Sequence, residues 1–369
     1  MNHKNSVCKV IAMYLPQFHP IPENDKWWGK GFTEWKNVGR AQSLFPGHYQ
    51  PRVPADLGYY DLRLPEVRKS QADMAKEYGI DGFCYYHYWF GNGRRLLERP
   101  FNEVLRLGEP DFPFMLCWAN ESWHEKFWDN KGGVSKNLLM EQIYGDENEY
   151  EAHFYSLLEA FKDPRYIKIE DKPAFMIYEP LKFPEVAQFI TKWQELAIKN
   201  GLEGIHFIGQ TQHAFRDKDK IIGLGFDAIN AVRIYDVLQH KSKLSRSFAR
   251  IKRSLFKTAL YEKYSNAVKY LTDPEFDSAP DVYPSIIPGW DHTPRSGRGG
   301  FLLHDFTPKY FANHVRNVFN VMRNKPVEKK ITFIKSWNEW GEGNYMEPDI
   351  RYGTQFLEVI KNIKNSEYS

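Results

Sequence analysis

Short apolar runs alternate with longer segments of helical period along this chain, and the alternation repeats eight times. The runs are rich in β-branched and aromatic residues and cover 9–15, 79–89, 112–120, 173–179, 204–210, 226–235, 282–290 and 329–337. Helical periodicity is clearest over 65–79, 146–162, 184–201 and 307–324. Pro65 marks the first turn of one of these helices and Gly201 the end of another. Eight strand–helix units predict an α/β fold, a single (β/α)8 TIM barrel over residues 1–369.

A two-domain, doubly wound sheet would also alternate strands and helices. The chain has no G-x-G-x-x-G sequence after its first apolar run and no Pro/Gly/Ser-rich linker that would divide it. Residues 17–64 form one long connection after the first predicted strand, rich in Pro, Gly, Trp and Tyr. Connections of this length are usually functional or disordered, and the aromatic content favours order. We therefore expect a long ordered loop after the first barrel strand.

Charge and cysteine content narrow the functional classes. The chain has 50 basic and 47 acidic residues, a net charge of +3, so we expect no nucleic-acid partner. Cys8, Cys84 and Cys117 are odd in number and imply no disulfide framework. The first residues lack the apolar core of a signal peptide and no apolar run approaches about 18 residues, so we expect a cytoplasmic protein. Aromatic residues make up 16% of the chain, many of them beside carboxylates and amides, which suits a sugar-binding cleft.

Polar and aromatic residues close most of the predicted strands. Catalytic groups of a TIM barrel come from the carboxyl ends of its strands, and aromatic rings, amides and carboxylates are the groups that recognise sugars. Any one of them has a structural explanation, since Tyr and Trp are amphipathic and His87 equally suits a core. We expect substrate contacts from Tyr14, Gln17, His19, Trp35, Tyr86, His87, Trp118, Asn120, Glu121, Tyr178, Gln210, Trp290, Trp337, Asn338 and Trp340.

Two glutamates, Glu339 and Glu342, follow the last predicted strand in the sequence SWNEWGEG (336–343). Positions three apart point to opposite faces of a strand but share a face after a turn or on a helix. Gly341 and Gly343 permit such a turn. Glycoside hydrolysis requires a carboxyl pair with one group protonated and one ionised, and burial beside tryptophans with mutual repulsion would separate the two pKa values. We predict that Glu339 and Glu342 are the catalytic pair.

The same stretch resembles the E-W-x-E-G element of glycoside hydrolase family 99, and the whole chain is similar to WbsX-type proteins of bacterial surface-polysaccharide (O-antigen) gene clusters. The blocks that carry the resemblance are YLPQFHPIPENDKWWGKGFTEWKNV (14–38), LFPGHYQPRVPADLGYYDLR (44–63), GIDGFCYYHYWF (79–90), CWANESW (117–123) and SWNEWGEG (336–343). They span most of the chain in the expected order. One departure is Gly341, where the family hydrolases are expected to carry a histidine.

The resemblance implies a retaining, endo-acting α-mannosidase-like enzyme that needs no metal or cofactor and acts on an oligo- or polysaccharide. It implies that Glu339 is a base on the substrate's own 2-hydroxyl, so that O2 attacks C1 and forms a 1,2-anhydro sugar. It further implies that Glu342 is the general acid and later the base for water.

Two other functional classes stay open. One is a glycosyltransferase or transglycosylase, the role often given to WbsX-type proteins, although the chain lacks a Gly-rich phosphate loop. The other is a non-catalytic glycan-binding barrel.

A basic segment, 241–271, carries Leu244, Phe248, Ile251 and Leu255 at helical spacing. The simplest interpretation packs this apolar stripe on the barrel. The alternative is a weak peripheral contact with an anionic membrane or a lipid-linked glycan.

Overall fold

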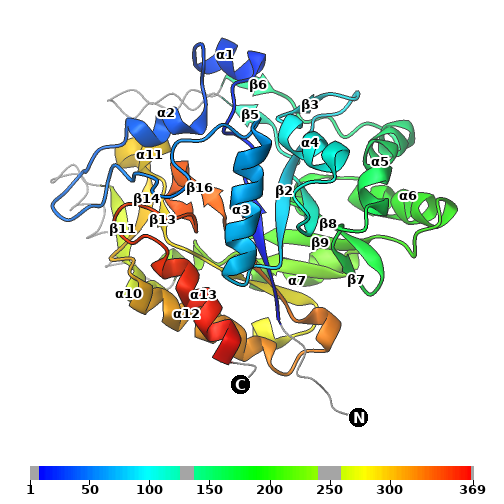
Figure 1. The fold of residues 1–369 in the computed structure, drawn as a ribbon. Helices are drawn as coiled ribbons and strands as arrows, with labels where there is room; N and C mark the ends of the chain where they lie inside the picture. Colours follow the sequence, from blue (N-terminus) through cyan, green and yellow to red (C-terminus); the bar gives the residue numbers. More distant parts are fainter. Residues whose placement is uncertain (1–7, 125–136, 240–258, 367–369) are drawn as a thin grey trace.

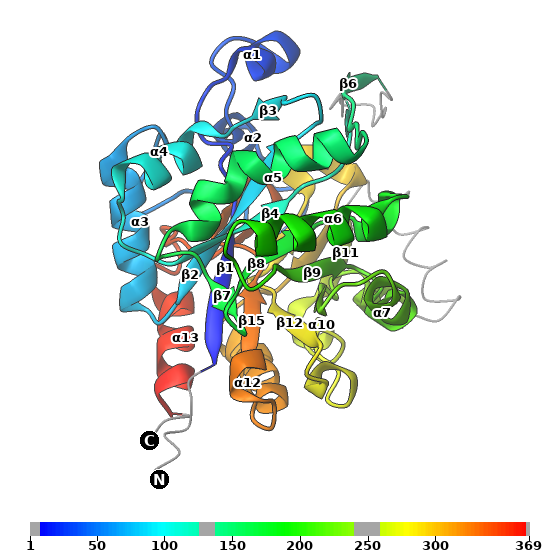
Figure 2. The same ribbon diagram turned by 90° about the vertical axis from the view of Figure 1, so that its right-hand side faces the viewer.

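The computed structural model describes residues 8–124, 137–239 and 259–366. Eight parallel strands pair in the order β1, β15, β12, β10, β9, β8, β4 and β2, and β2 pairs back to β1, which closes the sheet. Helices surround this closed sheet in both views (Figures 1 and 2). The predicted (β/α)8 barrel is confirmed.

Each barrel strand overlaps one of the eight predicted apolar runs. They are β1 (Lys9–Tyr14), β2 (Gly82–Trp89), β4 (Phe114–Trp118), β8 (Lys172–Ile177), β9 (His206–Thr211), β10 (Ala228–Ala231), β12 (Val282–Ile286) and β15 (Ile331–Ile334). Nearly every residue in them is buried, because helices cover one face and barrel side chains fill the other. Continuous apolar runs, without alternation, are the expected sequence of such strands.

The larger helices follow the strands in turn. They are α3 (Pro65–Glu77), α4 (Arg99–Leu107), α5 (Glu147–Lys162), α6 (Val186–Lys199), α7 (Ala214–Gly223), α12 (Pro308–Met322) and α13 (Gln355–Ser366). Proline occupies the first turn of α3 and of α12, and the Asp146 side chain accepts hydrogen bonds from the first backbone N–H groups of α5.

The long connection after β1 is ordered, as expected, and contains two short helices, α1 (Pro22–Trp28) and α2 (Glu34–Gly39). Together with the short strands β3 (Arg95–Leu96), β5 (Trp123–His124) and β6 (Leu138–Met140), these helices lie at the end of the barrel where the strands terminate (Figures 1 and 2). The start of β1 and the end of α13 lie at the opposite end (Figure 1). The connection therefore forms part of the end where a barrel carries its active site.

The seventh predicted run, 282–290, is wrong in its extent. β12 ends at Ile286 because Pro288 and Gly289, with φ of 79°, break the strand. Trp290 belongs instead to β13 (Trp290–Asp291), which forms a separate sheet with β14 (Phe301–His304) and β11 (Leu260–Lys263).

The remaining elements are short. They are α8 (Asp236–Gln239), α10 (Tyr264–Ala267), α11 (Thr293–Ser296), β7 (Lys168–Ile169), β16 (Asn338–Glu339), β17 (Asn344–Tyr345) and the 3-10 turns η1 (Pro180–Lys182), η2 (Phe276–Ser278), η3 (Gly297–Gly299), η4 (Val327–Lys329) and η5 (Trp340–Glu342).

Of the basic segment 241–271, the structure describes only the part that contains β11 and α10. Leu244, Phe248, Ile251 and Leu255 lie outside the described residues, so their packing, or a lipid contact, stays a prediction. Within the described ranges, no helix has the length and apolar character needed to cross a membrane.

Candidate active site

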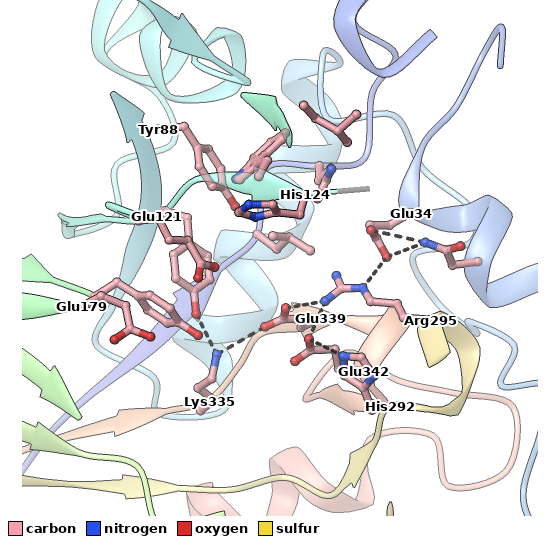
Figure 3. Close-up of a pocket in the computed structure, with 18 of the residues that line it drawn as sticks. Glu34, Tyr88, Glu121, His124, Glu179, His292, Arg295, Lys335, Glu339 and Glu342 are labelled. Atoms are coloured by element: carbon pink, nitrogen blue, oxygen red, sulfur yellow. Dashed lines mark hydrogen bonds and ion pairs between the residues drawn. The ribbon is translucent and has the colours of Figure 1, made fainter. Parts of the chain in front are cut away.

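A cavity of about 530 Å³ lies at the carboxyl ends of the barrel strands. One wall carries Glu121 and Glu179 from the ends of β4 and β8, and the opposite wall carries Glu34, Glu339 and Glu342 (Figure 3). The cavity is large enough for about one or two sugar units, in the range of small-molecule sites.

The two predicted catalytic glutamates lie on one turn. β15 is followed by Glu339 and then by the 3-10 turn η5, and the turn ends at Gly343 in the left-handed region with φ of 56°. A Cβ at Gly343 would lie 2.7 Å from Asp291 Cβ, so close packing also requires a glycine. The bend brings both carboxylates to the same wall of the cavity.

Arg295 binds both members of the pair. Its Nη1 donates to Glu342 Oε1 at 2.5 Å and to Glu339 Oε1 at 3.2 Å (Figure 3). Its Nε donates to Glu34 Oε2 at 3.2 Å, and His292 Nε2 lies 3.4 Å from Glu342 Oε1. One guanidinium therefore joins carboxylates from the connection after β1 and from the turn after β15.

A second cation, Lys335, lies on the other side of Glu339. Its Nζ donates to Tyr86 Oη at 2.7 Å and lies 3.5 Å from Glu339 Oε2, above the rings of Tyr86 and Tyr178. Burial disfavours a charged lysine, but Glu339, then Tyr178 and Glu342, outweigh burial and raise the pKa of Lys335. Lys335 is thus a fixed positive charge in the cavity.

The surroundings of the pair separate the two pKa values. Burial and then the neighbouring Glu342 raise the pKa of Glu339 above its ordinary value. Burial also acts to raise the pKa of Glu342, but Arg295 and then His292 outweigh burial and lower it well below its ordinary value. In the ligand-free protein the proton of the pair is favoured on Glu339, the reverse of the order that the resemblance implies.

Residues around the turn fix its position on the barrel. The Asn338 side chain accepts from the Leu15 backbone N–H and donates to the Leu15 carbonyl, which ties the segment after β15 to the end of β1. Ser336 Oγ accepts from the Glu339 backbone N–H at 3.0 Å. The Trp340 ring stacks on Tyr345 with ring centroids 3.7 Å apart.

Glu347 supports the turn from behind. Its carboxylate accepts hydrogen bonds from Tyr60 Oη, Gln71 Nε2 and Trp340 Nε1 at 2.6–2.8 Å. Burial raises the pKa of Glu347 to about 7, against the lowering effect of these hydrogen bonds. Glu347 does not line the cavity, so its contacts hold Trp340 and, through it, η5.

Seven of the predicted site residues line the cavity. They are Gln17, Tyr86, Glu121, Tyr178, Trp290, Glu339 and Glu342. The indole Nε1 of Trp290 is buried and has no hydrogen-bond partner among the described residues. A donor in this state is suited to an acceptor on a ligand.

The other ten predicted residues do not line this cavity, and their contacts with a substrate stay predictions: Tyr14, His19, Trp35, His87, Trp118, Asn120, Gln210, Trp337, Asn338 and Trp340. Tyr14, His87, Trp118 and Gln210 lie on barrel strands, whose side chains alternate between two faces. Most of the ten residues hydrogen bond within the protein. His87, for example, contacts His153 at 2.8 Å, Tyr14 donates to Gln71, and Trp118 donates to the Trp89 carbonyl. Gln210 lines a smaller neighbouring cavity instead.

Four ionisable residues that contact the carboxyl pair or its arginine were missed by sequence reasoning: Glu34, His292, Arg295 and Lys335. Lys335 directly follows β15, so the rule that strand ends carry function could have found it. Glu34 lies within the block 14–38 that carries the family resemblance. His292 and Arg295 lie in and beside the short helix α11, where no periodicity gives a signal.

A (β/α)8 barrel with a buried carboxyl pair in a cavity at its strand ends is the class that the fold and the site define. A sequence profile described as "Glycosyltransferase WbsX" matches residues 10–360, and the chain belongs to this family. Two proteins of Xanthomonas campestris pv. campestris, from strains B100 and ATCC 33913, both described as "Uncharacterized protein WxcX", are 38% identical over 353 residues, 95% of this chain and 49% of theirs. The chain thus spans about half the length of the curated relatives it matches.

Solved structures share the fold at low sequence identity. The GH99 endo-alpha-mannosidase from Bacteroides thetaiotaomicron is 15% identical with a TM-score of 0.57, and 97% of each chain is covered. A structure described as "Glycoside hydrolase-like protein" is 14% identical with a TM-score of 0.60, covering 98% of this chain and 95% of the other. At these identities the likeness bears on the barrel fold.

Proposed function

We propose that this protein is a glycoside hydrolase of family-99-like type that cleaves within an α-mannoside-like or related bacterial polysaccharide. The observation that carries the proposal is the convergence of Glu339 and Glu342 on Arg295 at one wall of the cavity. Two carboxyl groups with separated pKa values supply an acid and a base at one place. The cavity residues Tyr86, Tyr178 and Trp290 offer aromatic surfaces for the sugar.

The mechanism we propose retains configuration through a 1,2-anhydro sugar. Once the proton of the pair has moved from Glu339 to Glu342, Glu339 takes the proton of the substrate's 2-hydroxyl and O2 attacks C1. The bond from C1 to the leaving oxygen breaks as Glu342 gives its proton to that oxygen. Glu342 then takes a proton from water, the water oxygen attacks C1, and the C1–O2 bond breaks while O2 regains its proton from Glu339. A nucleophile and an acid ordinarily flank the glycosidic bond, whereas a base that acts on O2 can share one turn with the acid. The position of Glu339 and Glu342 on one turn supports this mechanism.

Turnover on defined glycans tests this proposal. Purified protein incubated with bacterial α-mannans and O-antigen oligosaccharides is expected to release fragments whose first-formed anomer, followed by proton NMR, has the configuration of the substrate. Inverted product, or no cleavage of any α-mannoside-like glycan, would contradict it.

The description of the family as a glycosyltransferase supports a second candidate function, that of a glycosyltransferase or transglycosylase in surface-polysaccharide biosynthesis. Transfer to an acceptor sugar would use the same carboxyl pair, with a sugar hydroxyl in the place of water. The same incubations, repeated with acceptor oligosaccharides and with sugar nucleotides, separate the two: a transferase lengthens the acceptor, whereas a hydrolase gives only shorter products.

A further inference from the structure

Arg295 is the point at which three carboxylates meet. Its Nη1 lies 2.5 Å from Glu342 and 3.2 Å from Glu339, and its Nε lies 3.2 Å from Glu34. Glu34 is buried, 4% exposed, and also accepts from Asn37 Nδ2. The guanidinium is therefore held on one edge by Glu34 while its other edge faces the carboxyl pair (Figure 3).

Gly341 makes the space for this arrangement. A Cβ built at Gly341 would lie 2.2 Å from Glu34 Oε2 and 3.0 Å from Arg295 Nε, and the first contact is one that real Cβ atoms do not make. Any side chain at this position, including the histidine expected from the family hydrolases, would displace Glu34 and crowd Arg295. The departure of this chain at Gly341 and the presence of the Glu34–Arg295 pair are thus two parts of one feature.

We propose that Arg295, oriented by Glu34 in the space that Gly341 leaves open, is the positioning residue of the carboxyl pair, which holds Glu342 as the carboxylate and leaves the exchangeable proton on Glu339. The role of this proton in catalysis rests on the proposed function. Its location on Glu339 rather than Glu342 concerns the ligand-free protein alone. Chemistry in the roles implied by the resemblance then begins with transfer of this proton from Glu339 to Glu342.

The distances and the electrostatics agree on this order. Glu342 has the shorter contact with the guanidinium and also faces His292, whereas Glu339 has the longer contact and a lysine 3.5 Å away. The pKa of Glu342 is lowered and that of Glu339 is raised. The other ionisable groups that face the cluster are Arg40 beside Glu34, and Tyr86, Tyr88, Glu121, Tyr178 and Tyr235 around the cavity.

The test measures protonation of the pair without any substrate, so its failure is distinct from failure of the hydrolase proposal. Protein carrying ¹³C in the glutamate side-chain carboxyl is titrated by NMR, and the two signals are assigned with Glu339→Gln and Glu342→Gln. We expect Glu342 to titrate below the ordinary glutamate range and Glu339 above it. A proton on Glu342 rather than Glu339 in the unaltered protein would overturn the proposal.

Variants test whether Arg295 and Gly341 determine which of the two glutamates carries the proton. Arg295→Met is expected to raise the pKa of Glu342 by roughly 1 to 3, as loss of an adjacent cation does, and Arg295→Lys by less. Gly341→Ala is expected to raise it too, because Cβ forces Glu34 and Arg295 apart. Arg298→Met and Gly299→Ala are matched controls at exposed positions of η3 that leave both values unchanged.

An unshifted Glu342 in folded Arg295→Met or Arg295→Lys protein would contradict the role given to Arg295. If Arg295→Met does not fold, Arg295→Lys and Gly341→Ala decide, since each keeps a positive charge in the site. Retention of the unaltered pKa of Glu342 in both of these variants would be equally contrary to the proposal.

Discussion

The stretch that follows β15 holds carboxyl groups in two contrasting environments. Glu339 and Glu342 face a cavity, and their nearest partners include the cations Arg295 and Lys335. Glu347, a few residues further on, is 2% exposed and lies away from the cavity. Its hydrogen bonds come from neutral donors, a phenol, an amide and an indole.

The contrast shows what each kind of partner does to a buried carboxyl. Neutral donors do not offset the cost of burying charge at Glu347, so its pKa is raised to about 7. At Glu342 a cation more than offsets burial, and the pKa falls. Cations placed unequally around a pair therefore create an acid and a base, whereas dipoles around a single carboxyl create an anchor for the turn.

The largest expected effect comes from removing the charge of the pair. Glu339→Gln or Glu342→Gln keeps the shape of the side chain but removes proton transfer, so kcat/KM on a cleaved oligosaccharide should fall about 1,000-fold with binding retained. Glu66→Gln, an exposed site on α3, is the control. Turnover by either variant at the unaltered rate would remove the pair from the mechanism, and a protein with binding but no turnover even when unaltered would be a lectin.

Glu347, which anchors the turn, should affect the free energy of unfolding. Because the pKa of folded Glu347 is about 7 and its ordinary value is 4.5, the folded state binds the proton more tightly than the unfolded state. The contribution of Glu347 to stability is therefore greatest below pH 4.5 and falls by about 3 kcal/mol as pH rises to 7, then levels off. Urea unfolding of Glu347→Gln and unaltered protein at several pH values measures this: the fall should be absent from the variant, and parallel curves would contradict the anchor role.

Lys335 tests the comparison between Glu339 and Glu347 further, because it is a cationic partner of Glu339, whereas the hydrogen bonds of Glu347 come from neutral donors. Its charge acts to lower the pKa of Glu339, so Lys335→Met should raise that pKa further. If Glu339 must be ionised to accept the 2-hydroxyl proton, the acid limb of the pH–rate profile moves to higher pH and activity on that limb falls about tenfold. The exposed Lys309→Met is the control, and an unmoved limb would exclude Lys335 from setting this pKa.

The smallest effect compares two indoles. The N–H of Trp340 is taken by Glu347, while that of Trp290 has no partner among the described residues and lies at the cavity. Trp290→Phe should raise KM about 2- to 10-fold with kcat little changed, the value of one neutral hydrogen bond. Trp340→Phe should lower the unfolding free energy instead. A raised KM in Trp340→Phe together with a lowered unfolding free energy in Trp290→Phe would contradict this prediction.

The local pattern of the sequence was sufficient for the barrel. A strand buried on both faces must be a continuous apolar run, and such runs can be counted without knowing their neighbours. The bend after β15 was equally local, since Gly341 and Gly343 are readable as a turn and place Glu339 beside Glu342. Strand limits were less secure, as at 282–290, because packing decides where pairing stops.

The charged residues around the carboxyl pair could not be predicted from neighbouring positions in the sequence. Glu34 and Arg295 are 261 positions apart, and Lys335 contacts Tyr86 across 249. The hydrophobic periodicity of helices and strands carries no information about contacts between residues so far apart in the sequence. Several residues predicted to contact substrate lie away from the cavity for a related reason: a strand has two faces, and only the closed barrel decides which one meets the cavity.

The sequence by itself determined eight buried strands, the order in which helices follow them and the turn that brings two carboxyl groups together, because each depends on the side chains of neighbouring positions. Only the tertiary structure decided which cations lie beside each carboxyl group, and so in which direction each pKa shifts. These shifts depend on burial and on the distances to cations such as Arg295 that other segments supply, and residue type alone specifies neither.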